Sequence, residues 1–300
     1  GNITHLSLPK NMLGYNIKTG KRIHSQCKLT VRRILKTSRN EEARNLYQLT
    51  NNRNIRSDSI LESTRVTEDH EIRQFSTRTL SKQSIASLWN GFLNLNEQCG
   101  IIRVLVEQFP KNVLVNWQTI TSKLPDNIVR FCRRYLIDCL SNGTNLQKWK
   151  QRETSNCLLS DKKDTQLHLF NNCEVALKRY IWRHNSILKT ITNNLLNSST
   201  EAFKIFADID GFENTNVLFK SSRPNEPNAD MYRQRPDIVI LERRRITVIE
   251  LTCPFETNLD KSHEFKWRKY RKLRDSLITP RAQFNLIFLE ISSIGFPGKT

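Results

Sequence analysis

The sequence predicts an α+β protein, in which a helical N-terminal region precedes a core of mixed helices and strands. Apolar residues recur at three-to-four spacing between Ser81 and Leu140, which is typical of helices. Two short apolar runs, Ile238–Leu241 and Ile246–Thr252, flank a polar turn and predict a β-hairpin. A helix at 264–273 and a strand at 284–291 follow. The expected order is therefore a helix-rich region and then α-β-β-α-β.

The rest of the chain is predicted from periodicity, proline positions and local composition. We expect irregular structure at 1–28, a short helix at 41–49, a charged, Ser/Thr-rich linker at 51–79, a helix at 126–140, a loop at 141–150 and a long helix at 174–196.

Composition limits the function classes. The chain has 300 residues, and its 48 Lys and Arg residues against 29 Asp and Glu residues give a formal net charge of +19. Such an excess favours a polyanionic partner, above all nucleic acid, although a basic protein without such a partner is the alternative. The sequence contains no run of eighteen apolar residues, so we expect no membrane-spanning segment.

Cysteine usage and the start of the chain bear on its origin. The seven cysteines are odd in number and widely scattered, which favours reduced thiols in the nucleus or cytoplasm over a disulfide framework. The chain starts at Gly1 without an initiator methionine or a signal-peptide pattern. We therefore expect a fragment of a longer polypeptide.

Two carboxylates lie on the predicted hairpin. Asp237 follows Arg235 and Pro236 at the mouth of the first strand, and Glu250 lies thirteen residues later inside the second. An acid flanked by apolar neighbours is seldom there without a partner. Because the strands pair, both acids should reach one edge and could bind a divalent metal ion. The alternatives are an ordinary Pro-Asp turn and an exposed edge-strand position.

The helix at 264–273 supplies candidate lysines. Lys266 and Lys269 belong to a stretch, 266–274, that holds six basic residues interleaved with Trp267 and Tyr270. Such a stripe can bind phosphates while an aromatic ring stacks on a base. The alternatives are a solvated helix face for the lysines and a core position for the aromatic residues.

A second cluster has the spacing of a metal site. If Ser160 were a cysteine, Cys157, Ser160, His168 and Cys173 would form Cys-x2-Cys-x7-His-x4-Cys. Three such ligands are a tetrahedral zinc site with one ligand lost, which Asp161 or water could complete. The alternative is a pair of free thiols and an exposed histidine in a loop.

Phe206-Ala-Asp-Ile-Asp210 has some similarity to the aspartate box of polymerases. That box needs adjacent aspartates on a tight hairpin and further motifs upstream, and neither is present, so we reject polymerase activity. Asp208 is then either a third acid near the site or a residue at a strand end.

These motifs, in this order, resemble the C-terminal region of non-LTR retrotransposon polyproteins that carry a restriction-like endonuclease. The resemblance covers roughly residues 125–295. It rests on Thr165–Cys173 with Leu177–Leu188, Phe206–Phe212, Arg235–Ile240, Ile249–Glu256, and Lys266 with Lys269-Tyr270.

The resemblance implies a PD-(D/E)xK restriction-endonuclease-like α/β core, with Asp237 and Glu250 as metal-binding acids for Mg²⁺ or Mn²⁺. Lys266 or Lys269 corresponds to the catalytic lysine, because Thr252 occupies the position where simpler nucleases of this fold have one. His184-Asn185 stands where the family often has His-Asp.

The implied organisation is a poorly structured or linker region at 1–80, a helical region at 81–150, a degenerate knuckle at 151–174 and the endonuclease domain at 175–300. Cys157, His168 and Cys173 would bind Zn²⁺ in the knuckle. The arginines expected to contact nucleic acid are Arg235, Arg243, Arg244, Arg245, Arg268 and Arg271.

The implied function is nicking of target DNA in the nucleus, after synthesis in the cytoplasm. The nick primes reverse transcription of element RNA by an upstream reverse transcriptase domain of the same polyprotein. The alternative is a catalytically decayed fragment that binds nucleic acid without cutting, which the loss of a knuckle cysteine favours. A third reading, a helical scaffold for protein partners, uses residues 81–140.

Overall fold

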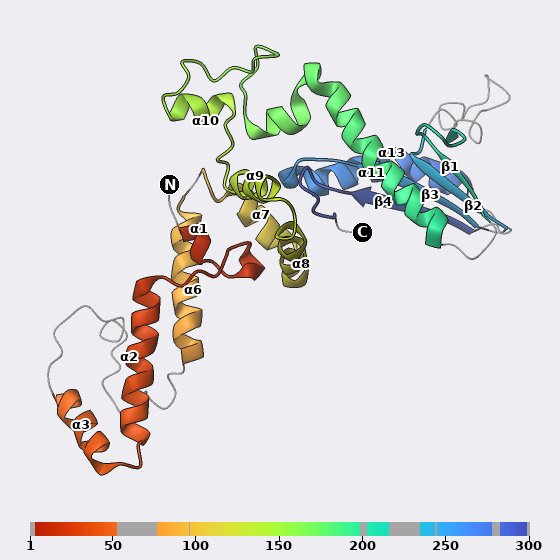
Figure 1. The fold of residues 1–300 in the computed structure, drawn as a ribbon. Coiled ribbons are helices and arrows are strands. Elements are labelled where there is room, and N and C mark those ends of the chain that lie inside the picture. Colours follow the sequence, from red (N-terminus) through yellow and green to blue (C-terminus); the bar gives the residue numbers. More distant parts are fainter. Residues whose placement is uncertain are drawn as a thin grey trace, which may run out of the picture. The chain divides into compact units, whose positions relative to one another are not determined.

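The computed structural model of the chain divides into two compact units, Gly1–Lys123 and Leu124–Thr300 (Figure 1). We describe each unit by itself. The structure describes residues 4–52, 77–95, 97–198, 203–215, 235–243, 245–277 and 283–298.

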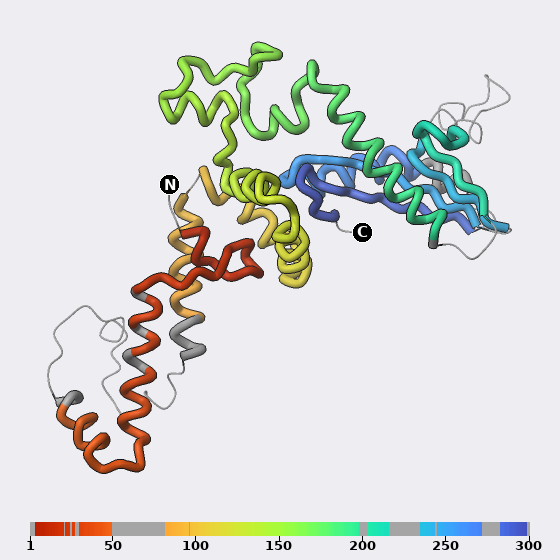
Figure 2. The backbone as a smooth tube through the Cα atoms, viewed as in Figure 1, coloured from red at the N-terminus to blue at the C-terminus, as the bar shows by residue number. Residues whose placement is uncertain are grey.

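All the secondary-structure elements described in the N-terminal unit are helices, as the periodicity predicted from residue 81 onward. Helix α2 runs alongside α6 (Figure 2). Phe92, Ile102 and Leu105 are fully buried and belong to the apolar core. The elements are α1 (Thr4–Ser7), η1 (Lys10–Met12), α2 (Gly20–Thr37), α3 (Glu41–Asn52), α6 (Thr77–Leu93), α7 (Gly100–Gln108) and α8 (Lys111–Thr121).

The described residues between 4 and 52 contain more helix than the sequence led us to expect. Helix α2 begins inside the segment that we expected to be irregular, because Thr19 caps it: its side-chain oxygen accepts a hydrogen bond from Arg22 N, at 3.2 Å. Helix α3 contains the short helix predicted at 41–49. Residues 53–76 of the predicted linker lie outside the described residues.

The boundary between the units also differs from the predicted division. It falls between Lys123 and Leu124, inside the region 81–150, so α9 belongs to the C-terminal unit. The loop predicted at 141–150 contains α10, whose first turn is capped by Asn142: its Oδ1 accepts a hydrogen bond from Asn145 N, at 2.9 Å.

The C-terminal unit carries a mixed four-stranded sheet in the order β1-β2-β3-β4. β1 pairs antiparallel with β2 and β2 with β3, whereas β4 is parallel to β3. Its elements are α9 (Asp126–Leu136), α10 (Gly143–Lys148), η2 (His168–Asn172), η3 (Glu174–Ala176), α11 (Leu177–Ser198), β1 (Lys204–Ala207), β2 (Ile238–Glu242), β3 (Arg245–Thr252), η5 (Glu256–Asn258), α13 (Leu259–Leu277) and β4 (Gln283–Glu290).

The α+β prediction is confirmed, and the hairpin forms in the expected antiparallel pairing, with Ile238 opposite Ile249. Among the described residues from α11 onward the order is α-β-β-β-α-β, one strand more than predicted. The extra strand, β1, has only four residues, which is too short to show a clear alternation of apolar and polar side chains.

Helices cover both faces of this sheet. Because successive residues of a strand point to opposite faces, Ile238 packs with Leu188 of α11, and Val239 packs with Tyr270 of α13. Figure 1 shows α11 in front of the sheet and α13 behind it. Leu188, Ile238, Val239 and Tyr270 are fully buried. Each such burial contributes about 1.5–3 kcal/mol.

An aromatic cluster joins α9 to the end of the sheet. The Tyr135 ring lies 5.1 Å from that of Phe170 and 5.9 Å from that of Phe255, centroid to centroid. Its hydroxyl donates a hydrogen bond to Oε2 of the fully buried Glu256, and Ile294 N donates to Oε1 at 3.2 Å. Burial raises the pKa of Glu256, and the hydrogen bond from Tyr135 partly opposes that rise.

Candidate functional site

The hairpin brings Asp237 and Glu250 to the same end of the sheet. Since Ile238 pairs with Ile249, Asp237 lies opposite Glu250. The backbone N–H of Asp237 donates to Glu250 Oε2 at 3.3 Å, and Leu251 N–H donates to Asp237 Oδ2 at 2.7 Å. The adjacent strands therefore hold the two acids by backbone hydrogen bonds, as the register requires.

Glu250 faces α13 and is almost completely buried. Its residue surface is 3% exposed, and its Oε1 forms an ion pair with Lys266 Nζ. Burial raises the pKa of Glu250, the charge of Asp237 adds to the rise, and Lys266 and Tyr270 oppose it. A buried carboxylate of this kind is stabilised in its ionised form by any further cation.

Tyr270 links the lysines to the acids. Its side chain is fully buried, its hydroxyl donates to the Arg235 carbonyl at 3.3 Å, and Lys269 Nζ donates to this hydroxyl at 3.1 Å. Burial, and after it the negative charge of Glu250, raises the pKa of Tyr270. The phenol therefore stays protonated.

The two lysines differ in what they touch. Lys266 contacts the Glu250 carboxylate directly. Lys269 reaches the site through Tyr270, with Nζ 4.6 Å from the centroid of that ring. Burial lowers the pKa of Lys269, Glu250 opposes the change, and Lys266 adds to it. Lys269 is exposed and contacts Tyr270, so it lies at the solvent-facing edge of the site.

Asp237 also reaches α11 on the other face of the sheet. Its Oδ2 lies 3.4 Å from His184 Nε2, which is itself 3.3 Å from the Leu251 carbonyl oxygen. Burial alone would lower the pKa of His184, but the hydrogen bond and charge of Asp237 outweigh it and raise this pKa. Asn185 Oδ1 lies 3.1 Å from the other ring nitrogen. The resemblance had singled out His184-Asn185, but not the contact with Asp237.

Asp208 follows the last residue of β1. Its Oδ1 accepts hydrogen bonds from Arg235 Nη2 and from Asn214 Nδ2, both at 2.7 Å. Its backbone N–H donates to the Asp237 carbonyl at 2.9 Å. Asp208 is thus a strand-end residue that also lies beside Asp237, so both readings of it fit the structure.

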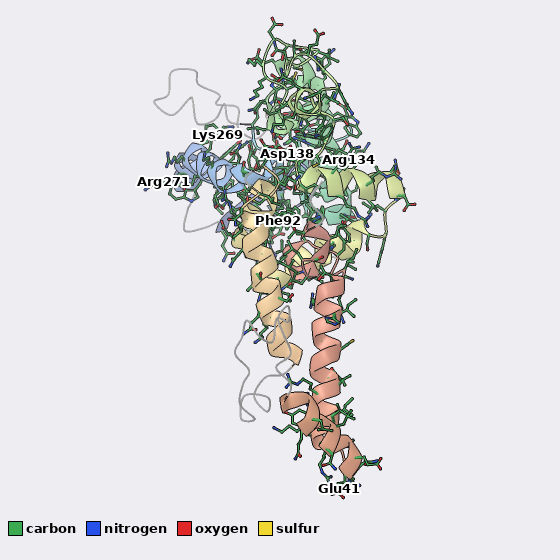
Figure 3. The ribbon with its side chains drawn as sticks, turned by 90° about the vertical axis from the view of Figure 1, so that its left-hand side faces the viewer. Glu41, Phe92, Arg134, Asp138, Lys269 and Arg271 are labelled. Atoms are coloured by element: carbon green, nitrogen blue, oxygen red, sulfur yellow. The ribbon has the colours of Figure 1, made fainter. Side chains whose placement is uncertain are left out.

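The other predicted nucleic-acid contacts spread over the hairpin turn and α13. Arg243 is exposed, and Arg245 lies 3.4 Å from Glu242. Arg268 is exposed beside Glu264. Figure 3 labels Lys269 and Arg271 on α13, the blue helix. Arg244 lies outside the described residues.

Cys157, His168 and Cys173 come together as the spacing predicted. One ligand atom from each lies within 4.8 Å of the others, which makes them the group of three in the described chain that could hold a metal ion. Ser160 Oγ lies 3.1 Å from His168 Nε2, at the position of the missing cysteine. Burial would raise the pKa of Cys157, but the N–H of Leu159, 3.4 Å from its sulfur, and the neighbouring polar groups lower it to about 7.

The segment that carries this candidate metal-binding group contacts the end of β3. Tyr180 OH accepts a hydrogen bond from Cys173 N at 3.1 Å and lies at the same distance from the His168 carbonyl oxygen. Asn171 Nδ2 and Arg183 Nη2 both donate to the Cys253 carbonyl, at 2.8 and 3.1 Å. Cys253 is three residues from Glu250, so the Cys157–Cys173 segment and the acid site pack in the same part of the structure.

Comparison with known proteins adds no relative: no protein-family model and no curated protein matches this chain. In the part of the chain that the structure describes, no helix is long and apolar enough to cross a membrane.

Proposed function

We propose that the chain is a metal-dependent endonuclease that nicks target DNA during retrotransposition. One observation carries the proposal: the hairpin holds Asp237 beside Glu250, and α13 adds Lys266 to the same cluster. The order α-β-β-β-α-β, with both acids at one end of the hairpin, supports a PD-(D/E)xK core. The net charge of +19 fits a DNA substrate.

The acids fit a Mg²⁺ or Mn²⁺ ion. Asp237 and Glu250 offer the carboxylate oxygens that such ions prefer. The raised pKa of Glu250 supports the proposal, because a bound cation would stabilise its ionised form. The ion would acidify a water molecule and stabilise charge on the phosphoryl oxygens. Leu251 N–H and His184 hold Asp237 in place.

The lysines then take separate roles. Lys266 neutralises and positions Glu250, because it contacts that carboxylate directly. Lys269, at the solvent-facing edge, would contact the scissile phosphate or orient the attacking water. Tyr270 fixes Lys269 relative to Glu250. Hydrolysis would leave a 3′-hydroxyl that primes reverse transcription of element RNA by an upstream polymerase domain.

A plasmid-nicking assay tests the proposal. Wild-type protein with Mg²⁺ should convert supercoiled plasmid to open circles, whereas Asp237→Ala and Glu250→Gln should not, although both should bind DNA nearly as well. Glu264→Gln is the matched control, because this acid lies on the exposed surface of α13 and should leave nicking unchanged. Equal nicking by wild type and Asp237→Ala would remove Asp237 from the mechanism.

A second candidate is a decayed binding module. Ser160 at the fourth knuckle position and Asn185 beside His184 favour it, because both depart from the pattern of active relatives implied by the resemblance. This module would bind DNA with strong salt dependence but would not nick it under any metal condition.

We also propose that Cys157, His168 and Cys173 bind Zn²⁺. Two thiols and an imidazole are the donors that zinc prefers, and Ser160 or a water molecule would complete the tetrahedron. The ion would stabilise residues 157–173 against the end of β3, which is a structural role.

A further inference from the structure

We propose that Phe265 stacks on an unpaired nucleotide base, so that the acid–lysine site takes nucleic acid with an unpaired segment beside the reacting phosphate. This inference rests on the proposed function, because it names the substrate class of the same site. It comes from the exposure of Phe265, from the charges around it and from its place on α13.

Phe265 is the most exposed of the three aromatic residues of α13. Its residue surface is 66% exposed, against 39% for Trp267 and 0% for Tyr270. The Arg271 guanidinium lies over the Trp267 ring, 5.1 Å from its centroid. The two aromatic residues that the sequence offered for stacking are thus partly covered or buried, and Phe265 presents the accessible ring.

The surroundings of Phe265 are cationic. Lys261, Arg268 and Lys269 are four residues before it, three after it and four after it, and helix geometry puts such positions on the same face. Glu264 is the acid nearest in sequence, and it pairs with Arg268 at 3.4 Å. An apolar ring among these charges complements a partner that combines flat apolar groups with negative charge, as nucleic acid does.

The ring lies within one helical turn of the site. Lys266, the next residue, pairs with Glu250, and Lys269, four residues on, donates to Tyr270 OH. A phosphate held between Lys269 and the acids would bring an adjacent nucleotide to this face of α13. A single exposed phenylalanine is ordinary on a protein surface. Its position beside the site is what gives Phe265 this role.

Stacking requires an unpaired base. In a duplex, base faces are occupied by their neighbours, and a protein reaches only base edges and the backbone. An aromatic side chain gains about 1–3 kcal/mol per base when the base is unstacked, whatever its identity. We therefore expect Phe265 to discriminate single strands, or locally opened duplexes, from paired DNA without reading sequence.

Fluorescence anisotropy in EDTA tests the inference apart from catalysis. Labelled single strands of DNA and RNA, and a DNA duplex of the same length, are titrated with the full chain. Phe265→Ala should weaken binding to both single strands about tenfold and binding to the duplex less than twofold. Phe265→Trp should restore binding. A 2-aminopurine in the single strand should lose its quenching with Phe265→Ala and keep it with Phe265→Trp.

Two control variants sharpen the result. Trp182 of α11 is 72% exposed and follows Lys178 and Arg179, but it lies on the other helix. Trp182→Ala should therefore leave single-strand binding unchanged. Arg268→Ala should weaken binding to single strands and to duplex alike and flatten the salt dependence of both, because we expect this exposed arginine to contact phosphates.

Three results would overturn the inference. The first is that Phe265→Ala leaves single-strand affinity unchanged. The second is that it lowers the affinity for single strands and for duplex equally. The third is that Trp182→Ala, instead of Phe265→Ala, selectively lowers single-strand affinity. Because the titrations contain no divalent metal, failure of the wild type to nick plasmid would count against the nuclease and not against stacking. Equal melting temperatures of Phe265→Ala and wild type would confirm that the exposed substitution leaves the fold intact.

Discussion

The backbone N–H of Asp237 donates a hydrogen bond to the Glu250 side chain, at 3.3 Å. This contact ties the first residue before β2 to an acid inside β3, so the distance between the two carboxylates depends on the register of the hairpin. A slip by one residue would turn Glu250 to the α11 face and separate it from Lys266. The hydrogen bond of Leu251 N–H to Asp237 Oδ2 fixes the same register from the other strand.

Lys266 should stabilise the fold chiefly by neutralising Glu250. Lys266→Gln leaves a buried carboxylate without its cation, which should lower the free energy of unfolding by about 1.5–3 kcal/mol in EDTA. Mg²⁺ should recover part of this loss, because the ion supplies the missing charge. Thermal melts with and without Mg²⁺ measure both effects. Lys269→Gln is the control and should change the melting temperature in EDTA little, because Lys269 is exposed. If Mg²⁺ stabilised Lys266→Gln no more than it stabilises wild type, the assignment of a metal ion to this site would be contradicted.

Tyr270→Phe should slow nicking without weakening DNA binding. The substitution removes only the hydroxyl, which accepts a hydrogen bond from Lys269 Nζ, and it keeps the buried ring. Because small displacements of catalytic groups are costly, we expect kcat to fall about 10- to 100-fold with KM nearly unchanged.

Steady-state nicking rates measured across a range of DNA concentrations give kcat and KM separately. Tyr180→Phe removes a tyrosine hydroxyl at the knuckle instead, and it should leave kcat near the wild-type value. A rise in KM with constant kcat would assign the Tyr270 hydroxyl to substrate binding.

The sequence predicted those parts of the site that depend on local pattern. Two apolar runs around a polar turn are enough to predict a hairpin, and the hairpin register then brings Asp237 opposite Glu250. The contact of His184 with Asp237 could not be predicted in this way, since it joins a helix to a strand end more than fifty residues away. Helical periodicity shows that one side of α11 faces the core, but it does not show which polar residue meets an acid there.

The sequence also did not show which aromatic residues of α13 are exposed. Trp267 and Tyr270 stood among basic residues and were open to either a stacking or a core reading, and the fold assigns Tyr270 to the core. Phe265, the exposed ring, has no distinguishing local signal. The buried pair of Tyr135 and Glu256 was also missed, because the partners are 121 residues apart and each sits in an ordinary local pattern.

Ser160→Cys should strengthen zinc binding. The substitution supplies a thiolate beside His168 and completes a four-ligand set with Cys157 and Cys173. Loss of an outer-shell partner alone costs about 10- to 100-fold in metal affinity, so a restored ligand should gain about tenfold or more. Competition with a chromophoric zinc chelator measures the affinity. Ser160→Ala should bind no more tightly than wild type, and His168→Ala should bind least; equal affinities for all four proteins would rule out this centre.

The pH dependence of stability should identify Glu256 as a destabilising charge at neutral pH. Burial raises the pKa of Glu256 in the folded state above its unfolded value, so the folded protein holds this proton more tightly. The contribution of Glu256 to stability is therefore complete below the unfolded pKa, about 4.3, and is lost as the pH rises through the folded pKa. Glu256→Gln imitates the protonated form and removes this dependence.

Urea unfolding of wild type and Glu256→Gln across that pH range measures the effect. The free energy of unfolding of the variant, relative to wild type, should increase as the pH rises. Glu174→Gln provides a control of opposite sign, because the hydrogen bond from Lys162 lowers the pKa of Glu174, so that its stabilising contribution grows as the pH rises. A constant difference between Glu256→Gln and wild type would contradict this prediction, because it would mean that the hydrogen bonds from Tyr135 and Ile294 fully offset the effect of burial in the folded state.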